Sequence, residues 1–149
     1  MPDMMKSVFS NGSLGSLVDG WLLVLRLSSC SFMIAAHGMR SLNKLFAVGE
    51  IQFDGPFGMN PLLSVLLVVF AEIFCAFLVL IGLWGRLALL PLIFTMFVAA
   101  FIAHYNDPFQ KRELALLFIL IFISLYVFGS GKYSVDHYLS TREKSFKLQ

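Results

Sequence analysis

Four long apolar runs constrain the fold of this chain more than any other feature of its sequence. They cover about residues 18–40, 61–84, 86–104 and 108–129, and each is close to the ~20 residues that a helix needs to cross a hydrocarbon core of ~30 Å. Of the 149 residues, 58% are hydrophobic and 13% are charged, whereas soluble domains carry roughly 25% charged residues. We therefore expect one domain that is embedded in a lipid bilayer.

Start and stop signals for helices separate these runs. The pairs Asn60-Pro61 and Asp107-Pro108 each place a capping side chain before a proline, which favours the first turn of a helix. Gly129 follows the fourth run, and glycine is the commonest residue just beyond a helix end. These boundaries predict an all-α integral membrane protein that is built as a four-helix transmembrane bundle.

The bundle is expected over residues 18–131, between a polar N-terminal segment (1–17) and a polar C-terminal tail (132–149) that we expect to fray. The N-terminal segment lacks the layout of a removable signal peptide. Four spans would place both termini on one side, and that side holds more Lys and Arg residues than the other. The positive-inside rule therefore predicts cytoplasmic termini.

The two halves of the chain resemble each other as helical hairpins. Each has a histidine near the outer end of its first helix, His37 or His104, and a glutamate on its second helix, Glu72 or Glu113. A tandem repeat of two helical hairpins would explain this pattern. Few positions match, so separate hairpins without a repeat are the alternative.

Arg26 and Glu72 are opposite charges inside the first and second apolar runs. A charge at the bilayer centre costs a few kcal/mol or more unless it has a partner, and it often marks function. A rise of ~1.5 Å per residue places both at similar depths, which predicts a direct or water-bridged contact between adjacent antiparallel helices. Such a pair either fixes the register of two helices or forms part of a working site.

Other polar and sulfur-containing side chains share the helix faces of these two charges. Cys30 and His37 lie on the same helical stripe as Arg26, and Cys75 lies on the stripe of Glu72. If the stripes face each other, the five residues form an intramembrane polar seam. The two cysteines differ in estimated depth by more than a disulfide allows, so we expect no bridge between them.

A second group, His104, Glu113 and Lys44, is expected at the outer interface. Histidine and glutamate can bind a metal or relay protons. The spacing within one helix does not match a metal site, so we predict interfacial histidines and no metal. The loop at 41–61 either covers the seam as a lid or fills the interface, and we favour the filler.

Familiar chemical motifs are missing from the sequence. It contains no phosphate-binding glycine loop, dinucleotide fingerprint, haem-ligand pair or nucleophile with an adjacent base. We therefore identify no catalytic residues and expect no independent catalytic activity. The net charge of +2 gives no argument for nucleic acid binding.

Several segments resemble the DoxX family of small bacterial four-helix membrane proteins. They are LRL (25–27), HGMRSLNKLF (37–46), FAEIFCAFLVLIGLWGRLALL (70–90), ELALLFILIFISL (113–125) and GSGKYSVDHYL (129–139). The resemblance covers about residues 20–139. The positions that match the polar pattern of the family are Arg26, His37, Lys44, Glu72, Arg86 and Glu113.

The resemblance implies a location in the bacterial inner membrane and partners among oxidoreductases, but no established set of catalytic residues. The leading hypothesis is an accessory subunit of a membrane redox system, quinone-linked or active against oxidative stress, with quinone as a candidate cofactor. A non-catalytic scaffold or assembly factor is the first alternative. A small proton-coupled transporter, which would need a homo-oligomer, is the second.

Overall fold

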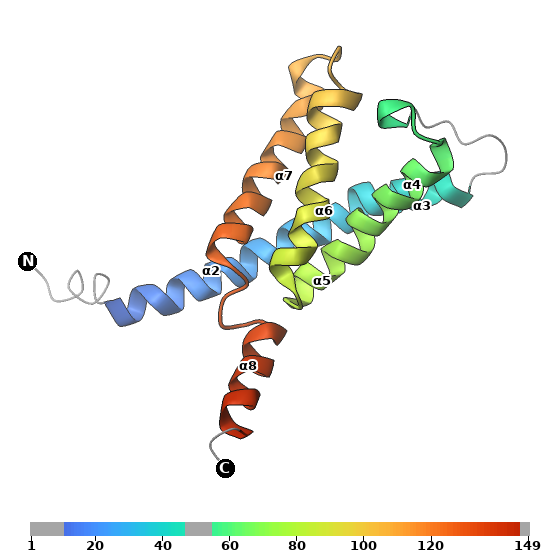
Figure 1. The fold of residues 1–149 in the computed structure, drawn as a ribbon. Coiled ribbons are helices and arrows are strands. Elements are labelled where there is room, and N and C mark those ends of the chain that lie inside the picture. The colour runs from blue at the N-terminus through green and yellow to red at the C-terminus, as the bar shows by residue number, and fades with distance from the viewer. Residues whose placement is uncertain (1–10, 47–54, 147–149) are drawn as a thin grey trace, which may run out of the picture.

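The structure is a computed structural model that describes residues 11–46 and 55–146, and within them all side chains except those of 11–14, 57 and 143–146. The described residues are helical or lie in turns, without strands. Three helices are long and apolar enough to cross a membrane: Gly15–Phe46, Pro61–Ile81 and Gly85–Ala103. The expected all-α membrane architecture is confirmed to that extent (Figure 1).

The first helix is longer than the first apolar run. It consists of α2 (Asn11–Phe32), the π-helical segment η1 (Met33–Gly38) and α3 (Met39–Phe46) without a break. The helix therefore extends beyond the run expected at about 18–40, because apolar residues at helical spacing continue on both sides of it. Of the loop expected at 41–61, residues 41–46 are helical and 47–54 lie outside the described residues.

The second helix returns antiparallel to the first. A short 3₁₀ turn, η2 (Pro56–Gly58), precedes α4 (Pro61–Val69), the π-helical segment η3 (Phe70–Cys75) and α5 (Ala76–Ile81). The Asn60 cap is confirmed, because its side-chain oxygen accepts a hydrogen bond from the N–H of Leu62 at 2.9 Å. Gly82, at φ 74°, ends the helix.

The helix end at Gly82 is a Schellman motif. The N–H of Leu83 donates to the carbonyl of Leu78 at 3.0 Å, and the N–H of Gly82 donates to that of Val79 at 3.0 Å. Glycine fits here because the motif requires a left-handed backbone. The chain then turns sharply into the second hairpin.

The second hairpin contains α6 (Gly85–Val98), the π-helical segment η4 (Ala99–Ala103) and α7 (Phe109–Phe128). The expected Asp107 cap was wrong, because Pro108 is the N-cap residue of α7 and no side chain caps this helix. The stop at Gly129 is confirmed, with φ 80°. Charged residues at 111–113 shorten the uncharged part of α7, so the expected fourth span is not established by length and composition.

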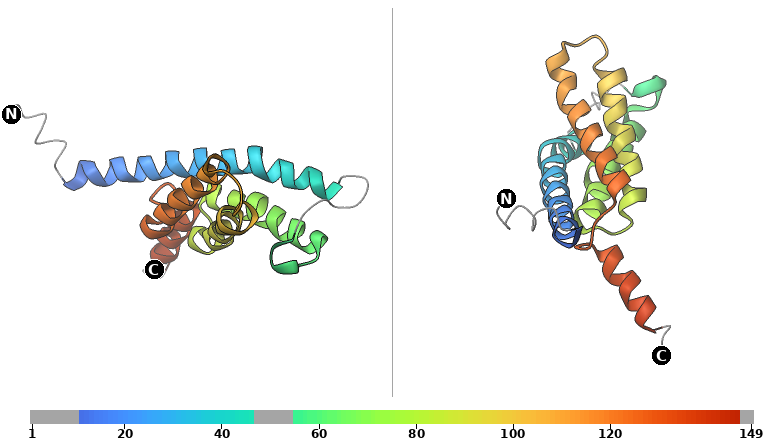
Figure 2. Two further views of the ribbon diagram at one scale, coloured as in Figure 1. Left: turned by 90° about the horizontal axis from the view of Figure 1, so that it is seen from above. Right: turned by 90° about the vertical axis from the view of Figure 1, so that its left-hand side faces the viewer.

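The C-terminal tail was expected to fray after Lys132, and this expectation was wrong. Residues Val135–Phe146 form a further helix, α8. The Ser134 hydroxyl oxygen accepts a hydrogen bond from the N–H of His137 at 3.2 Å, which is the pattern of an N-cap. Helix α8 stands off one end of the bundle and continues past the ends of the long helices (Figures 1 and 2).

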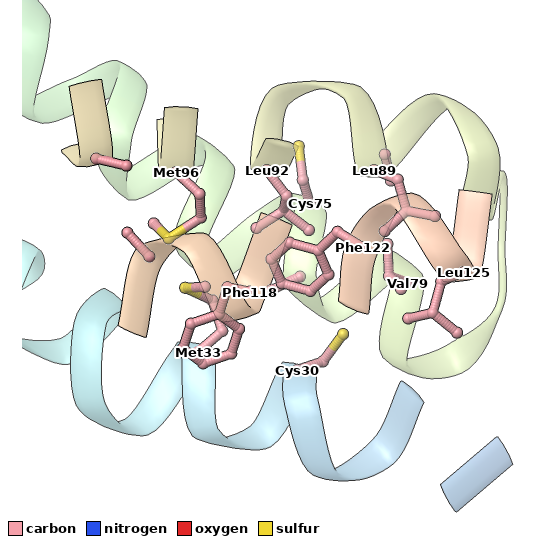
Figure 3. Close-up of a cluster of buried hydrophobic side chains, with 14 of the residues drawn as sticks. Cys30, Met33, Cys75, Val79, Leu89, Leu92, Met96, Phe118, Phe122 and Leu125 are labelled. Atoms are coloured by element: carbon pink, nitrogen blue, oxygen red, sulfur yellow. The ribbon is translucent and has the colours of Figure 1, made fainter. Parts of the chain in front are cut away.

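The two hairpins cross and bury one core between them (Figure 2). The starts of α2 and α8 lie at the same end, which we call the terminal end; the opposite end, with the turn between η4 and α7, is the loop end. The core is rich in sulfur and aromatic side chains (Figure 3). It includes Cys30, Met33, Cys75, Val79, Met96, Phe118 and Phe122.

The first hairpin depends on a close approach of its two helices at Gly38. A Cβ at this position would lie 2.7 Å from Cγ1 of Ile73 and 3.2 Å from the carbonyl oxygen of Glu72. Both distances are too short for ordinary packing. Only glycine allows η1 and η3 to lie this close.

We predict that Gly38→Ala destabilises the bundle by about 1–3 kcal/mol, because the added methyl group overpacks the contact between η1 and η3. Gly20→Ala is the matched control, since a Cβ at Gly20 meets nothing within 4 Å. The Gly20→Ala control should be more stable than the native protein by about 0.5–1 kcal/mol, because alanine has a higher helix propensity than glycine. Thermal unfolding in detergent measures both, and equal midpoints would refute the close-contact argument.

Candidate functional site

Arg26 is buried at the terminal end, where its guanidinium donates to backbone carbonyls. The side chain is 2% exposed. Nη1 donates to the carbonyl of Ser130 at 2.7 Å, and Nη2 donates to that of Tyr133 at 2.6 Å. Two charge-assisted hydrogen bonds offset part of the cost of burying the cation. Arg26 thereby ties α2 to the linker between α7 and α8.

Two aspartates complete this connection. The Asp19 carboxylate accepts a hydrogen bond from the N–H of Lys132 at 3.1 Å and lies 3.4 Å from its Nζ. The Asp136 carboxylate accepts from the N–H of Trp84 at 3.0 Å and from that of Gly85 at 3.3 Å. Trp84 has φ 49°, a value that is uncommon outside glycine, and this capping holds the turn in place.

We call this arrangement the terminal clasp and define it as Asp19, Arg26, Asp136 and the linker 129–134. Close packing at Gly82 is part of it, because a Cβ there would lie 2.6 Å from both Arg26 Nη1 and Ser134 Cβ. The N–H of Asp136 also donates to the carbonyl of Gly82 at 3.0 Å. The clasp joins α2, α5, α6 and α8 at one point.

Glu72 lies in a different environment, between the two helices of the first hairpin. Its side chain is 5% exposed, and Oε2 accepts a hydrogen bond from the Ser41 hydroxyl at 2.7 Å. Lys44 and Arg40, on the same helix as Ser41, lie close enough to attract the carboxylate electrostatically. One carboxylate therefore faces one hydroxyl donor and two nearby cations.

The backbone around Glu72 is irregular on both helices. Glu72 lies within η3 (Phe70–Cys75), and the adjacent helix carries η1 (Met33–Gly38). π-helical turns occur frequently at functional sites, because the inserted residue changes the direction of side chains and weakens the regular hydrogen bonding. Glu72 is thus the carboxylate that the described structure places at such a pair of turns, which also carry His37 and Cys75.

The expected contact between Arg26 and Glu72 was wrong. Among the described side chains, no hydrogen bond or ion pair joins the two. Arg26 lies level with Gly82, whereas Glu72 lies level with Gly38. At a rise of ~1.5 Å per residue, Glu72 and Gly82 are about 15 Å apart along their helix. The depth estimate failed because α2 begins at Asn11, well before the first apolar run.

The predicted polar seam is interrupted for the same reason. Cys30 and Cys75 are buried and free, as expected, and their thiols lie in the apolar core (Figure 3). His37 is half-buried, with its ring edge-on to Phe118 at 5.6 Å between ring centroids. The stripes do face the interior, but an apolar layer separates the terminal clasp from Glu72.

The second predicted group is not gathered into one site. Nδ1 of His104 is hydrogen-bonded to the Asp107 carboxylate at 2.7 Å, and Lys111 Nζ donates to the same carboxylate at 3.0 Å. Glu113 is exposed in the early part of α7, and Lys44 lies near Glu72 instead. Within the described residues, no three His, Cys, Asp or Glu side chains gather as a metal site would require.

Sequence reasoning missed Ser41, Asp19 and Asp136. Ser41 was assigned to a loop, because the apolar run ends just before it. Asp136 lies in the segment GSGKYSVDHYL, where a serine two residues before it marks a helix start. Its role in capping α6 carried no sequence signal, because the two segments are far apart in the chain.

We predict that the effects of Arg26→Ala and Glu72→Ala on stability are additive. Each should destabilise the protein by about 1.5–3 kcal/mol through lost charge-assisted hydrogen bonds. The double variant should match the sum within about 0.5 kcal/mol, since the two residues share no partner. Unfolding in detergent by denaturant measures all four proteins. A coupling energy well above 1 kcal/mol would instead indicate a direct contact between Arg26 and Glu72.

The loop-end turn provides a pH-dependent prediction. Hydrogen bonds from His104 and then Lys111 hold the pKa of Asp107 below its usual range. A lowered pKa in the folded state stabilises the fold above about pH 4 and loses that contribution as the pH falls further. In the Asp107→Asn variant, the midpoint of thermal unfolding should therefore depend less on pH below about pH 4. If Asp107→Asn has the same pH profile as the native protein, the Asp107 carboxylate does not stabilise the fold in this way.

The chain matches a known protein family by sequence. No curated protein and no solved structure matches the chain. The sequence model of the DoxX family matches residues 21–105, which is more than half of the chain. The match contains Arg26, Ser41 and Glu72 and ends before α7 and the linker that Arg26 holds. The chain belongs to the DoxX family.

Proposed function

We propose that this protein is an accessory subunit of a membrane redox system, quinone-linked or active against oxidative stress, in the bacterial inner membrane. Membership of the DoxX family supports the class of protein. The single observation that carries the proposal is the hydrogen-bonded pair of buried Glu72, within the π-helical segment η3, and half-buried Ser41, in α3 just after η1. It places a carboxylate and a hydroxyl together between the two helices of the first hairpin.

The chemistry of this site suits the head group of a quinone. Small-molecule sites in proteins are mostly apolar, with a few polar groups that fix orientation. The Ser41 hydroxyl, whose one proton is donated to Glu72 at 2.7 Å, would turn from Glu72 to donate to a quinone carbonyl oxygen, and the Glu72 carboxylate could then accept from a hydroxyl of the reduced head group. A bound quinone would supply electron transfer that is coupled to proton uptake. In that setting Glu72 would hold the proton, and Arg40 and Lys44 would stabilise the charge that remains.

The proposal includes four membrane spans with cytoplasmic termini. The charged residues of α7 lie at 111–113, in its first turns, where they would remain near water while 114–128 cross the apolar core. The Lys and Arg distribution favours the terminal end as the cytoplasmic side. Trp21, Trp84 and Tyr133 are exposed at that end, as an interfacial aromatic belt requires.

A non-catalytic assembly factor is the second candidate, and the terminal clasp favours it. Asp136 and Ser134 fix the start of α8 through hydrogen bonds to the turn before α6 and within the linker. A helix mounted in this way beyond the spans (Figure 1) offers a surface for another subunit. In this version the redox chemistry belongs entirely to the partner, and Glu72 serves only packing.

The test is the quinone content of the purified protein. We expect quinone to remain bound in mild detergent, and we expect Glu72→Gln to lose most of it, because the amide keeps the shape but loses the carboxylate. Glu113→Gln is the matched control, since Glu113 is exposed. Solvent extraction followed by chromatography measures quinone per protein.

Two outcomes would contradict the quinone site. One is native protein without quinone, isolated from cells that contain it. The other is equal quinone content in Glu72→Gln and Glu113→Gln. If the native protein then still purifies in a larger complex, the assembly factor becomes the better description.

A further inference from the structure

An open hollow of about 380 Å³ lies at the terminal end, between the start of α6, the linker 129–134 and α8. One rim is apolar and consists of the exposed side chains of Trp84 and Leu87. The remaining wall is polar. Its side chains that bear on the argument are Arg86, Ser130, Asp136 and His137.

Arg86 is the cation of this hollow. Its side chain is exposed, and among the described residues no hydrogen bond or ion pair is assigned to it. A Cβ added at Gly129 would lie 3.8 Å from Arg86 Nη2, so the guanidinium lies against the start of the linker. A guanidinium offers five N–H donors in a planar fork that matches phosphate geometry.

The acceptor oxygens of Asp136, the carboxylate in the wall, are already occupied. Both carboxylate oxygens of Asp136 accept hydrogen bonds from the N–H groups of Trp84 and Gly85. The start of α6 therefore offers no free donor at these positions, and binding of an anion would depend on Arg86. The Ser130 hydroxyl lies against Gly85, where an added Cβ would overlap it. It provides a second donor near the guanidinium.

The position of the hollow indicates the source of the anion. The membrane span of α6 begins at Gly85, so the hollow lies where a span meets the head groups. Trp84 is exposed beside it, and tryptophan is enriched at this level of a membrane. Basic pockets at helix ends bind the head groups of anionic lipids. An apolar rim beside a cation matches a molecule with acyl chains and a phosphate.

We propose that this hollow binds the phosphate of an anionic phospholipid, with Arg86 as its principal ligand, Ser130 as a second donor, and Trp84 and Leu87 beside the acyl chains. Inorganic phosphate carries the same anionic group and could bind Arg86 in the same way. The apolar rim at the membrane boundary favours the lipid, because only the lipid has acyl chains. This site is separate from Glu72 and independent of the proposed redox role.

The proposal is tested by native mass spectrometry of the full-length protein, delipidated and then titrated with phosphatidylglycerol or phosphatidylcholine in detergent. Native protein should retain phosphatidylglycerol in preference to phosphatidylcholine. Arg86→Gln should weaken retention by about tenfold to a hundredfold, as expected for the loss of a hydrogen bond between charged groups. Arg86→Lys should retain an intermediate amount, because it keeps the charge.

Arg142→Gln is the matched control. Arg142 is an exposed cation on α8 that lies over the Tyr138 ring, outside the hollow. Non-specific attraction would weaken lipid retention equally in Arg86→Gln and Arg142→Gln, and this result would overturn the proposal. Equal retention of both lipids would overturn it as well. Displacement of phosphatidylglycerol by millimolar inorganic phosphate would assign the site to the free ion instead.

Discussion

A guanidinium that leaves water for the interior of an apolar bundle costs several kcal/mol unless its donors find acceptors, and this constraint organises the terminal end of the structure. Arg26 meets it with the carbonyls of Ser130 and Tyr133. These acceptors exist only because α7 stops at Gly129 and the linker folds back over α2. The position of the linker then fixes α8 and brings Asp136 to the start of α6. Arg26, Asp19 and Asp136 together thus connect four helices at this end.

The separation of Arg26 from Glu72 changes what each of them can do. A direct pair would neutralise both charges and leave neither available. Instead, Arg26 is bound to two backbone carbonyls through Nη1 and Nη2, whereas Glu72, in η3 and close to η1, faces a hydroxyl and two nearby cations. Sulfur-containing and aromatic side chains fill the layer between them. The terminal clasp therefore has a structural role, and we place the functional site at Glu72.

Much of the fold could be predicted from local signals, and less of the site. Apolar runs, the Asn60 cap and the stop at Gly129 are encoded by neighbouring residues, and the structure has them as expected. The inward faces of Arg26, Cys30, Glu72 and Cys75 followed from helical spacing. The register between helices did not, because it depends on where α2 begins and on the close contact at Gly38. Counting depth from the ends of the apolar runs therefore placed Arg26 beside Glu72, whereas the register of the helices separates them.

The most direct test of this account is a carbon–carbon dipolar coupling between Cζ of Arg26 and the carboxyl carbon of Glu72, measured by solid-state NMR on selectively labelled protein in bilayers. We expect no measurable coupling between these two carbons. Each should instead show contacts to its own partners, Arg26 to the carbonyl carbons of Ser130 and Tyr133, and Glu72 to Cβ of Ser41. A strong coupling at ion-pair distance would contradict the separation on which the proposed division of roles depends.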